Sequence, residues 1–145
     1  MYMFGKDFTP QSEKDYNTIK GYLELLDRYE WHFMVTFTTS EYLSIMGAFS
    51  KMSRLSRYLY ERQGEEFKIF WVAEPHESGS YHIHAMIIVK DAKARTIKSA
   101  WNKFSGTREK TNNRCKIKPY QKGKGGNVYT IKNIMKDNIE HGFVL

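Results

Sequence analysis

Residues 67–90, FKIFWVAEPHESGSYHIHAMIIVK, decide the fold of this chain. The stretch contains an apolar run that ends at Ala73, a break with Pro, Gly and Ser, and a second, alternating run from Tyr81 to Val89. Two such runs around a turn predict a β-hairpin. If the turn is centred near Ser78, the two strands pair so that Glu74 faces His82.

The two faces of this hairpin differ in chemistry, because side chains alternate along a strand. The core face consists of Ile69, Trp71, Ala73, Ile83, Ala85 and Ile87. The other face carries Glu74, His82 and His84 within roughly 5 to 8 Å of one another. Two imidazoles and one carboxylate form a metal site with open coordination positions. A polar solvent face is the alternative reading, and His76 and Glu77 in the turn are alternative ligands.

Length and composition predict one domain, residues 1–145, in a reducing compartment. At 145 residues the chain is long enough to bury a core. The lone Cys115 has no partner for an intramolecular disulfide. No apolar run approaches the about 18 residues of a membrane span, and no signal peptide is recognisable, so we expect a cytoplasmic protein with no membrane partner. The phosphate-binding loop of an ATPase or helicase domain is missing from the sequence.

Positive charge is concentrated in one part of the chain. The net charge is +7. Residues 92–124 hold eleven Lys or Arg against Glu109 alone, whereas residues 1–91 hold ten basic and thirteen acidic side chains. A patch of this kind predicts an acidic partner such as nucleic acid.

The N-terminal half reads as helix, strand and helix before the hairpin. Residues 12–29 predict an amphipathic helix with Ser12 as its N-cap, and residues 31–38 alternate as a strand. Thr38 and Glu41 have capping-box spacing and predict a second helix that runs to about Arg62. Its expected core stripe is Tyr42, Ile45, Met46, Phe49, Met52 and Leu59.

The remaining residues predict three further elements. Ala94 to Phe104 has helical spacing, and residues 114–119 form a short strand with Arg114, Lys116 and Lys118 on one face. That face is also typical of an edge strand protected by charge. After the loop QKGKGGN, a last helix is expected from Asn127 to about Glu140.

This element order predicts an α+β fold, the ferredoxin-like split β-α-β arrangement with an antiparallel sheet. Both crossover helices would cover one face of the sheet. The opposite face would stay free for a ligand. The N-terminal helix and the C-terminal helix are additions to this arrangement.

The last helix supplies a candidate nucleophile. Tyr129, Lys132 and Lys136 line up at i, i+3 and i+7 along one stripe. A tyrosine with a pKa of about 10 is a poor nucleophile at neutral pH. A nearby cation or metal ion changes this by stabilising phenolate or the charge of the transition state.

The ordered set of motifs resembles the HUH endonucleases, which nick single-stranded DNA. The His82-Ile83-His84 triplet is similar to their His-hydrophobe-His motif, and MVTFTT at 34–39 is similar to the first-strand motif of replication initiators. Glu74 falls where these proteins commonly place a carboxylate ligand. Tyr129 and Lys132 match their Tyr-x-x-Lys motif. The resemblance covers residues 31 to about 136.

The resemblance implies a metal-dependent nickase and strand joiner that starts replication of a plasmid, phage or virus in a prokaryotic host. Mg or Mn would be held by Glu74, His82 and His84. Tyr129 would form a covalent 5′-phosphotyrosine link, assisted by Lys132. The expected partners are single-stranded DNA at an origin or hairpin nick site, host replication proteins and a second copy in a homodimer. The expected DNA-binding residues are Arg114, Lys116, Lys118, Lys122, Lys124 and Lys136.

Four alternatives remain open on sequence grounds. A single-Tyr HUH transposase would use the same chemistry, whereas a non-catalytic module would bind single-stranded nucleic acid without cutting it. Two His and one carboxylate also suit a non-haem iron oxygenase. Zinc bound by His82, His84 and Cys115 is the fourth.

Overall fold

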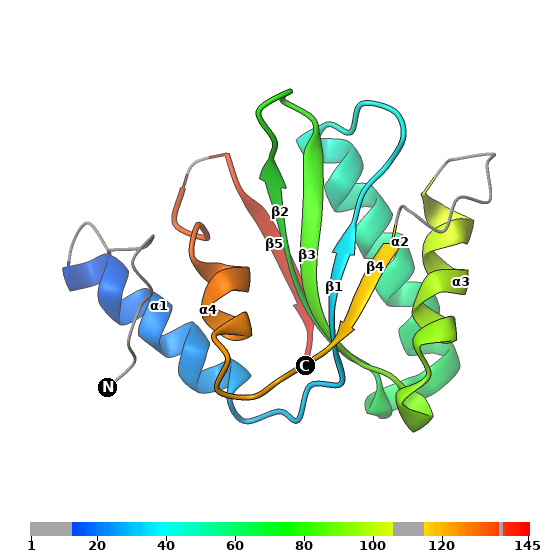
Figure 1. Cartoon of the computed structure of the whole chain (residues 1–145), viewed down its shortest axis with the longest axis horizontal. Helices are drawn as coiled ribbons and strands as arrows, with labels where there is room; N and C mark the ends of the chain where they lie inside the picture. The colour runs from blue at the N-terminus through cyan, green and yellow to red at the C-terminus, as the bar shows by residue number, and fades with distance from the viewer. Residues whose placement is uncertain (1–12, 106–114, 137) are drawn as a thin grey trace.

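A five-stranded antiparallel sheet with the strand order β4-β1-β3-β2-β5 forms the centre of the molecule (Figure 1). The computed structural model describes residues 13–105, 115–136 and 138–145. The strands are β1 (Phe33–Phe37), β2 (Lys68–Pro75), β3 (Tyr81–Ile88), β4 (Cys115–Pro119) and β5 (Glu140–Val144). The first four strands have the order expected of a ferredoxin-like split β-α-β fold, which confirms the predicted fold class.

The β2–β3 hairpin has the predicted register. Trp71 pairs with Ala85, Ala73 with Ile83 and Glu74 with His82. The turn is closed by a hydrogen bond from the backbone N–H of Gly79 to the carbonyl of His76, and Gly79 takes the positive φ of 87° that the turn requires. The alternation of apolar and polar side chains is therefore preserved across both strands.

The crossover helices α2 (Ile45–Gln63) and α3 (Ala94–Phe104) cover one face of the sheet. The apolar hairpin face is completely buried against them, together with Phe37, Leu55 and Trp101. The Trp101 ring lies 4.6 Å from the Phe37 ring, and its indole N–H donates to the Thr38 carbonyl. This side is the main core.

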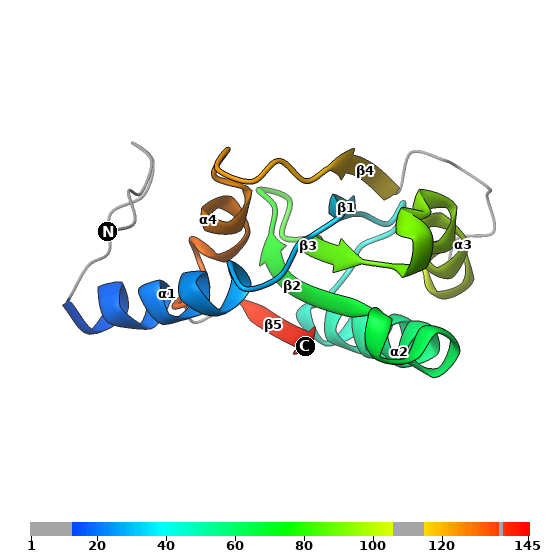
Figure 2. The same cartoon turned by 90° about the horizontal axis from the view of Figure 1, so that it is seen from below.

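The opposite face carries a second apolar cluster under α1 (Glu13–Leu26) and the short α4 (Gly126–Ile131). Figure 2 shows these two helices apart from α2 and α3. Phe70, Val72 and Met86 of the sheet are buried here against Leu23 and Ile131. The face expected to be free for a ligand is therefore only partly free, because apolar residues of β2 and β3 point toward it and need a cover.

The start of α2 differs from the prediction. The helix begins at Ile45, and Ser44 is its N-cap, with the hydroxyl accepting a hydrogen bond from the N–H of Gly47. Thr38 and Glu41 do not form the expected capping box, because the chain stays extended until Ser44. The helix is consequently rotated relative to the predicted stripe: Met52 and Leu59 are buried, whereas Tyr42 and Met46 are more than 70% exposed.

The C-terminal prediction is wrong in length and type. The last helix ends at Ile131 rather than near Glu140, and turns follow it. The expected tail contains the strand β5, which pairs with β2 from Ile69 to Ala73. The apolar spacing of residues 128–139 suited a helix, but pairing of β5 with the open edge of β2 satisfies backbone groups that a longer helix would leave unpaired.

No helix in the described part of the chain is long and apolar enough to cross a lipid bilayer.

Gly142 lets β5 lie against the Trp71 ring. A Cβ atom at Gly142 would lie 2.7 Å from three atoms of the rigid indole. We therefore expect Gly142→Ala to lower the free energy of unfolding by about 1 to 3 kcal/mol, the usual range for overpacking. Urea unfolding followed by Trp fluorescence measures it.

Gly21→Ala is the matched control, since a Cβ at this exposed helix position meets nothing within 4 Å. It should raise the free energy of unfolding by ~0.5 to 1 kcal/mol through helix propensity. Equal effects of the two substitutions would contradict the packing of β5 on Trp71.

Candidate metal and nucleophile site

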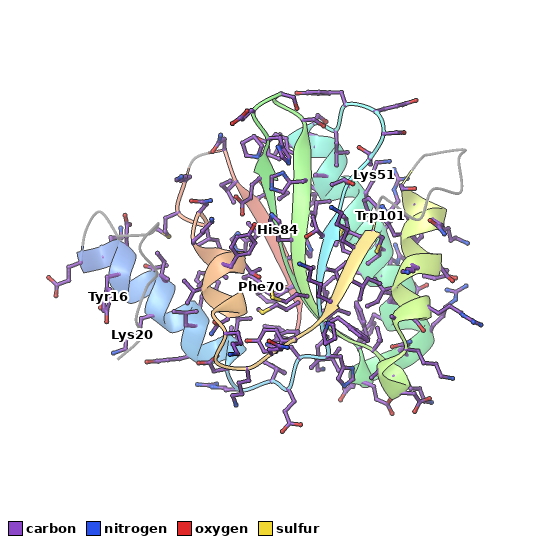
Figure 3. All side chains as sticks on the ribbon, in the orientation of Figure 1. Tyr16, Lys20, Lys51, Phe70, His84 and Trp101 are labelled. Carbon is purple, nitrogen blue, oxygen red and sulfur yellow. The ribbon has the colours of Figure 1, made fainter. Side chains whose placement is uncertain are left out.

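Glu74, His82 and His84 lie together on the hairpin face that is turned toward α4. The rings of His82 and His84 are 4.6 Å apart, and Glu74 is the direct cross-strand partner of His82. Glu74 and His84 are over 90% buried. Figure 3 shows His84 in the middle of the sheet, beside α4. The three side chains come from one rigid hairpin because its register fixes them.

A hydroxyl from β1 orients His84. Thr36 is the cross-strand neighbour of His84, and its Oγ1 lies 3.3 Å from the Nδ1 atom of the imidazole. This contact occupies one ring nitrogen and leaves Nε2 available as a ligand, the arrangement common around metal-binding histidines.

Both imidazoles are held neutral by their surroundings. Burial, followed by the neighbouring His76, lowers the pKa of His82 to about 4. Burial lowers the pKa of His84 to about 4 as well, with smaller contributions from His82 and Lys132. Metal-ligating histidines must be neutral, so both are ready to bind an ion at neutral pH without losing a proton.

The Glu74 carboxylate has one bound and one unbound oxygen. Asn133 Nδ2 donates a hydrogen bond of 2.9 Å to Oε2. Oε1 of Glu74 and Nδ1 of His82 are buried and have no hydrogen-bond partner among the described residues. Buried polar atoms without partners are costly, and a bound ion is one explanation for such atoms.

Tyr129 completes the cluster from the other side. Its ring lies 5.2 Å from the ring of His84, with an edge-on orientation, and its side chain is 47% exposed. Lys132 places its Nζ 4.6 Å from the centre of the Tyr129 ring. The structure therefore brings together all five residues expected to form the site, Tyr129, Lys132, Glu74, His82 and His84.

The donor set fits a divalent ion by chemistry and by its unpartnered atoms. As they stand, however, no three His, Cys, Asp or Glu side chains among the described residues converge closely enough to hold a metal ion. His76 of the turn stacks at 4.3 Å on His82 and extends the row of imidazoles. Glu77, the other alternative, is exposed in the turn.

Zinc bound by His82, His84 and Cys115 is excluded by geometry. Cys115 pairs with Phe37 on β1 and belongs to the main core, on the opposite face of the sheet from the histidines. Burial also raises the pKa of its thiol to about 12, which disfavours the thiolate that zinc requires.

A groove of about 520 Å³ runs from the histidines to the basic edge strand. We call it the β1–β4 groove; among the residues that line it are Thr36, His84, Lys116, Lys118, Lys124 and Tyr129. Lys116 is the cross-strand partner of Thr36, so the lysines of β4 share the face of the site. Open on one side and lined by cations, the groove suits an extended polyanion.

Three other basic residues expected to bind DNA are not placed in the groove. Arg114 lies outside the described residues. Lys122 is exposed in the glycine turn and does not line the groove. Lys136 is exposed in the turns after α4, so it does not continue a helical stripe from Tyr129.

Sequence reasoning missed Asn133, which binds Glu74, and Gln121, which lines the groove. One signal for Asn133 was present, namely its position four residues after Tyr129. An asparagine at that spacing is too common to be noticed without the hydrogen bond.

Comparison with known protein families places the chain. Residues 32–138 match a family model of replication-associated proteins, the one described by the name ORF2. The chain therefore belongs to this family of replication-associated proteins, which indicates a role in replication initiation and in nucleic-acid binding. Searches among curated proteins and among solved structures gave no match.

The neutral imidazoles predict acid sensitivity of the metal-free protein. Because the folded pKa values of His82 and His84 lie below the unfolded value of 6.5, the unfolded chain binds more protons between about pH 6.5 and pH 4. Stability should therefore be fully present above pH 6.5 and should fall as the pH is lowered through this window. Chemical unfolding with a chelator present, at a series of pH values, measures it.

The double variant His82→Gln/His84→Gln removes both groups and should flatten this part of the profile. A wild-type stability that stays constant or rises toward pH 4 would contradict neutral buried imidazoles.

Proposed function

We propose that this chain is a site-specific nickase and joiner of single-stranded DNA of the HUH type, which initiates replication through a covalent tyrosyl intermediate. The observation that supports it most is the position of Tyr129 between a cation and a buried histidine pair: Lys132 Nζ is 4.6 Å from its ring centre and the His84 ring is 5.2 Å away. A phenol in this setting is aimed at a charged group bound on the hairpin.

Tyr129 acts as the nucleophile in the proposed reaction. Its phenol oxygen forms a bond to the scissile phosphorus while the bond from phosphorus to the 3′ oxygen breaks. The phenol loses its proton and the departing 3′ oxygen gains one. The products are a 5′-phosphotyrosyl protein and a free 3′-hydroxyl.

Lys132 supplies positive charge beside the phenol. The ammonium stabilises the developing phenolate and the negative charge of the transition state, an effect that is strong in a partly buried site. It also repels protons from His84, which agrees with its contribution to the low pKa of that imidazole.

Glu74, His82 and His84 would hold the divalent ion, Mg or Mn. When bound, such an ion polarises the phosphate and helps to orient it for in-line attack. The protein contributes a fixed hairpin, a neutral imidazole pair, and Thr36 and Asn133 as hydrogen-bond partners of the ligands.

Covalent linkage keeps the energy of the phosphodiester bond. A 3′-hydroxyl that stays bound in the β1–β4 groove can attack the phosphotyrosine and reverse the step without ATP. Lys116, Lys118 and Lys124 line that groove and would hold the DNA backbone. Membership in a replication-associated family favours an origin over a transposon end as the substrate.

Tyr129→Phe should form no covalent adduct with single-stranded DNA and should bind the same DNA with unchanged affinity, because only the attacking oxygen is lost. Denaturing gels of an oligonucleotide pool incubated with Mg or Mn, without iron, detect the adduct. Fluorescence anisotropy measures the binding.

Tyr60→Phe is the matched control, since Tyr60 is similarly exposed at 45% but lies on α2. It should retain the adduct. Cleavage by Tyr129→Phe would remove this residue from the reaction, and DNA binding by the wild type with no adduct under any condition would favour the non-catalytic module.

Lys116→Gln/Lys118→Gln should weaken DNA binding and reduce its salt dependence. Each lost phosphate contact on a single strand lowers the slope of log K against log salt by about 0.7, so the pair should lower it by about 1.4. Anisotropy titrations at several salt concentrations give the slope.

Lys14→Gln/Lys90→Gln is the control, because both lysines are exposed and neither lines the β1–β4 groove. Its slope should equal that of the wild type. Equal slopes for both double variants would argue against the groove as the path of the DNA.

A further inference from the structure

Asn133 lies where the nucleophile segment meets the hairpin. It follows Lys132 directly and is four residues after Tyr129, and its Nδ2 donates to Glu74 Oε2 over 2.9 Å. No other hydrogen bond joins the described side chains of this segment to the carboxylate on β2. The contact therefore connects two parts of the chain that each supply a different component of the site.

The hydrogen bond makes the two oxygens of Glu74 unequal. Oε2 is occupied by Asn133, whereas Oε1 is buried and has no partner among the described residues. Turning the carboxylate over would leave Oε2 with no donor, and a buried acceptor without a donor costs about 1 to 3 kcal/mol. Asn133 thus fixes which oxygen is free to bind an ion and the direction in which it points.

The backbone around Asn133 is anchored on both sides. Ile131 and Ile134 are buried in the second cluster, and the N–H of Ile134 donates to the carbonyl of Ile131 over 2.9 Å. A side chain held between two buried neighbours loses little entropy when it binds Glu74. The same anchored segment carries Tyr129 one turn earlier.

We propose that Asn133 is a positioning residue that presents Oε1 of Glu74 to the divalent ion and couples the ion site to the segment that carries Tyr129. This inference rests on the proposed function for the role of the ion, but its first readout is metal affinity rather than cleavage. Partners of metal ligands typically contribute 10- to 100-fold to affinity.

A merely structural role for Asn133 makes a different prediction. If the amide only satisfied a buried carboxylate, its loss would lower thermal stability and leave the affinity for the ion unchanged. Mn²⁺ affinity of the metal-free full chain, measured by electron paramagnetic resonance or calorimetry, separates the two roles.

Asn133→Leu keeps the approximate size of the side chain and removes the donor. We expect its dissociation constant for Mn²⁺ to rise about 10- to 100-fold relative to the wild type. Asn138→Ala is the control: this exposed asparagine of the same segment accepts a bond from Tyr81 only through its backbone carbonyl, which alanine retains. Its Mn²⁺ affinity should be that of the wild type.

A double-mutant cycle with Glu74→Ala tests whether Asn133 acts through the carboxylate. In the Glu74→Ala background, Asn133→Leu should change the Mn²⁺ affinity less than about twofold. An equal loss in both backgrounds, an unchanged affinity in Asn133→Leu, or no Mn²⁺ binding by the wild type overturns the proposal.

Adduct formation keeps this result distinct from the proposed function. Excess Mn²⁺ should restore the adduct in Asn133→Leu but not in Tyr129→Phe. If the wild type forms the adduct and Asn133→Leu binds Mn²⁺ normally, the role of Asn133 fails alone. If Asn133→Leu weakens Mn²⁺ binding but the wild type forms no adduct, the nickase fails and the role of Asn133 at the ion site stands.

Discussion

The register of the β2–β3 hairpin is the constraint on which the rest of the structure depends. With Glu74 opposite His82, all the aliphatic residues of one hairpin face are turned to α2 and α3, and the polar residues are turned to α4. A slip of one residue would bury the carboxylate in the main core and expose Trp71. The free energy of the main core therefore also determines the geometry of the candidate site, since both depend on the same pairing.

The second apolar cluster explains why α4 is where it is. Phe70, Val72 and Met86 extend the site face away from the histidines and must be covered. Ile131 supplies part of the cover, and this packing places Tyr129 over His84. The glycine turn before α4 permits the approach, because Gly125 takes a φ of 82° and Gly126 leaves room for the Met34 sulfur. Hydrophobic burial and the position of the nucleophile are thus products of one contact.

The parts of the fold that could be predicted from sequence are those governed by strict alternation or a clear turn. The hairpin, its register and the ferredoxin-like strand order follow from these signals. The end of α4 could not be predicted, because Val128, Ile131 and Met135 have helical spacing and the competing partner, the edge of β2, lies far away in the sequence. For the same reason Tyr129 and Lys132 were identified as a pair, whereas Asn133 became visible only through a contact with Glu74 across 59 positions.

The segment that bears Tyr129 is held at both ends. At its beginning, Asn127 donates to Asp27 at the end of α1 over 2.8 Å. At its far end, the Tyr81 hydroxyl donates to the carbonyl of Asn138 just before β5 is added to the sheet. A chain fixed at two points can twist about its length but cannot swing open like a door. Passage of a strand from cleavage to rejoining therefore requires the nucleic acid to travel past a stationary phenol.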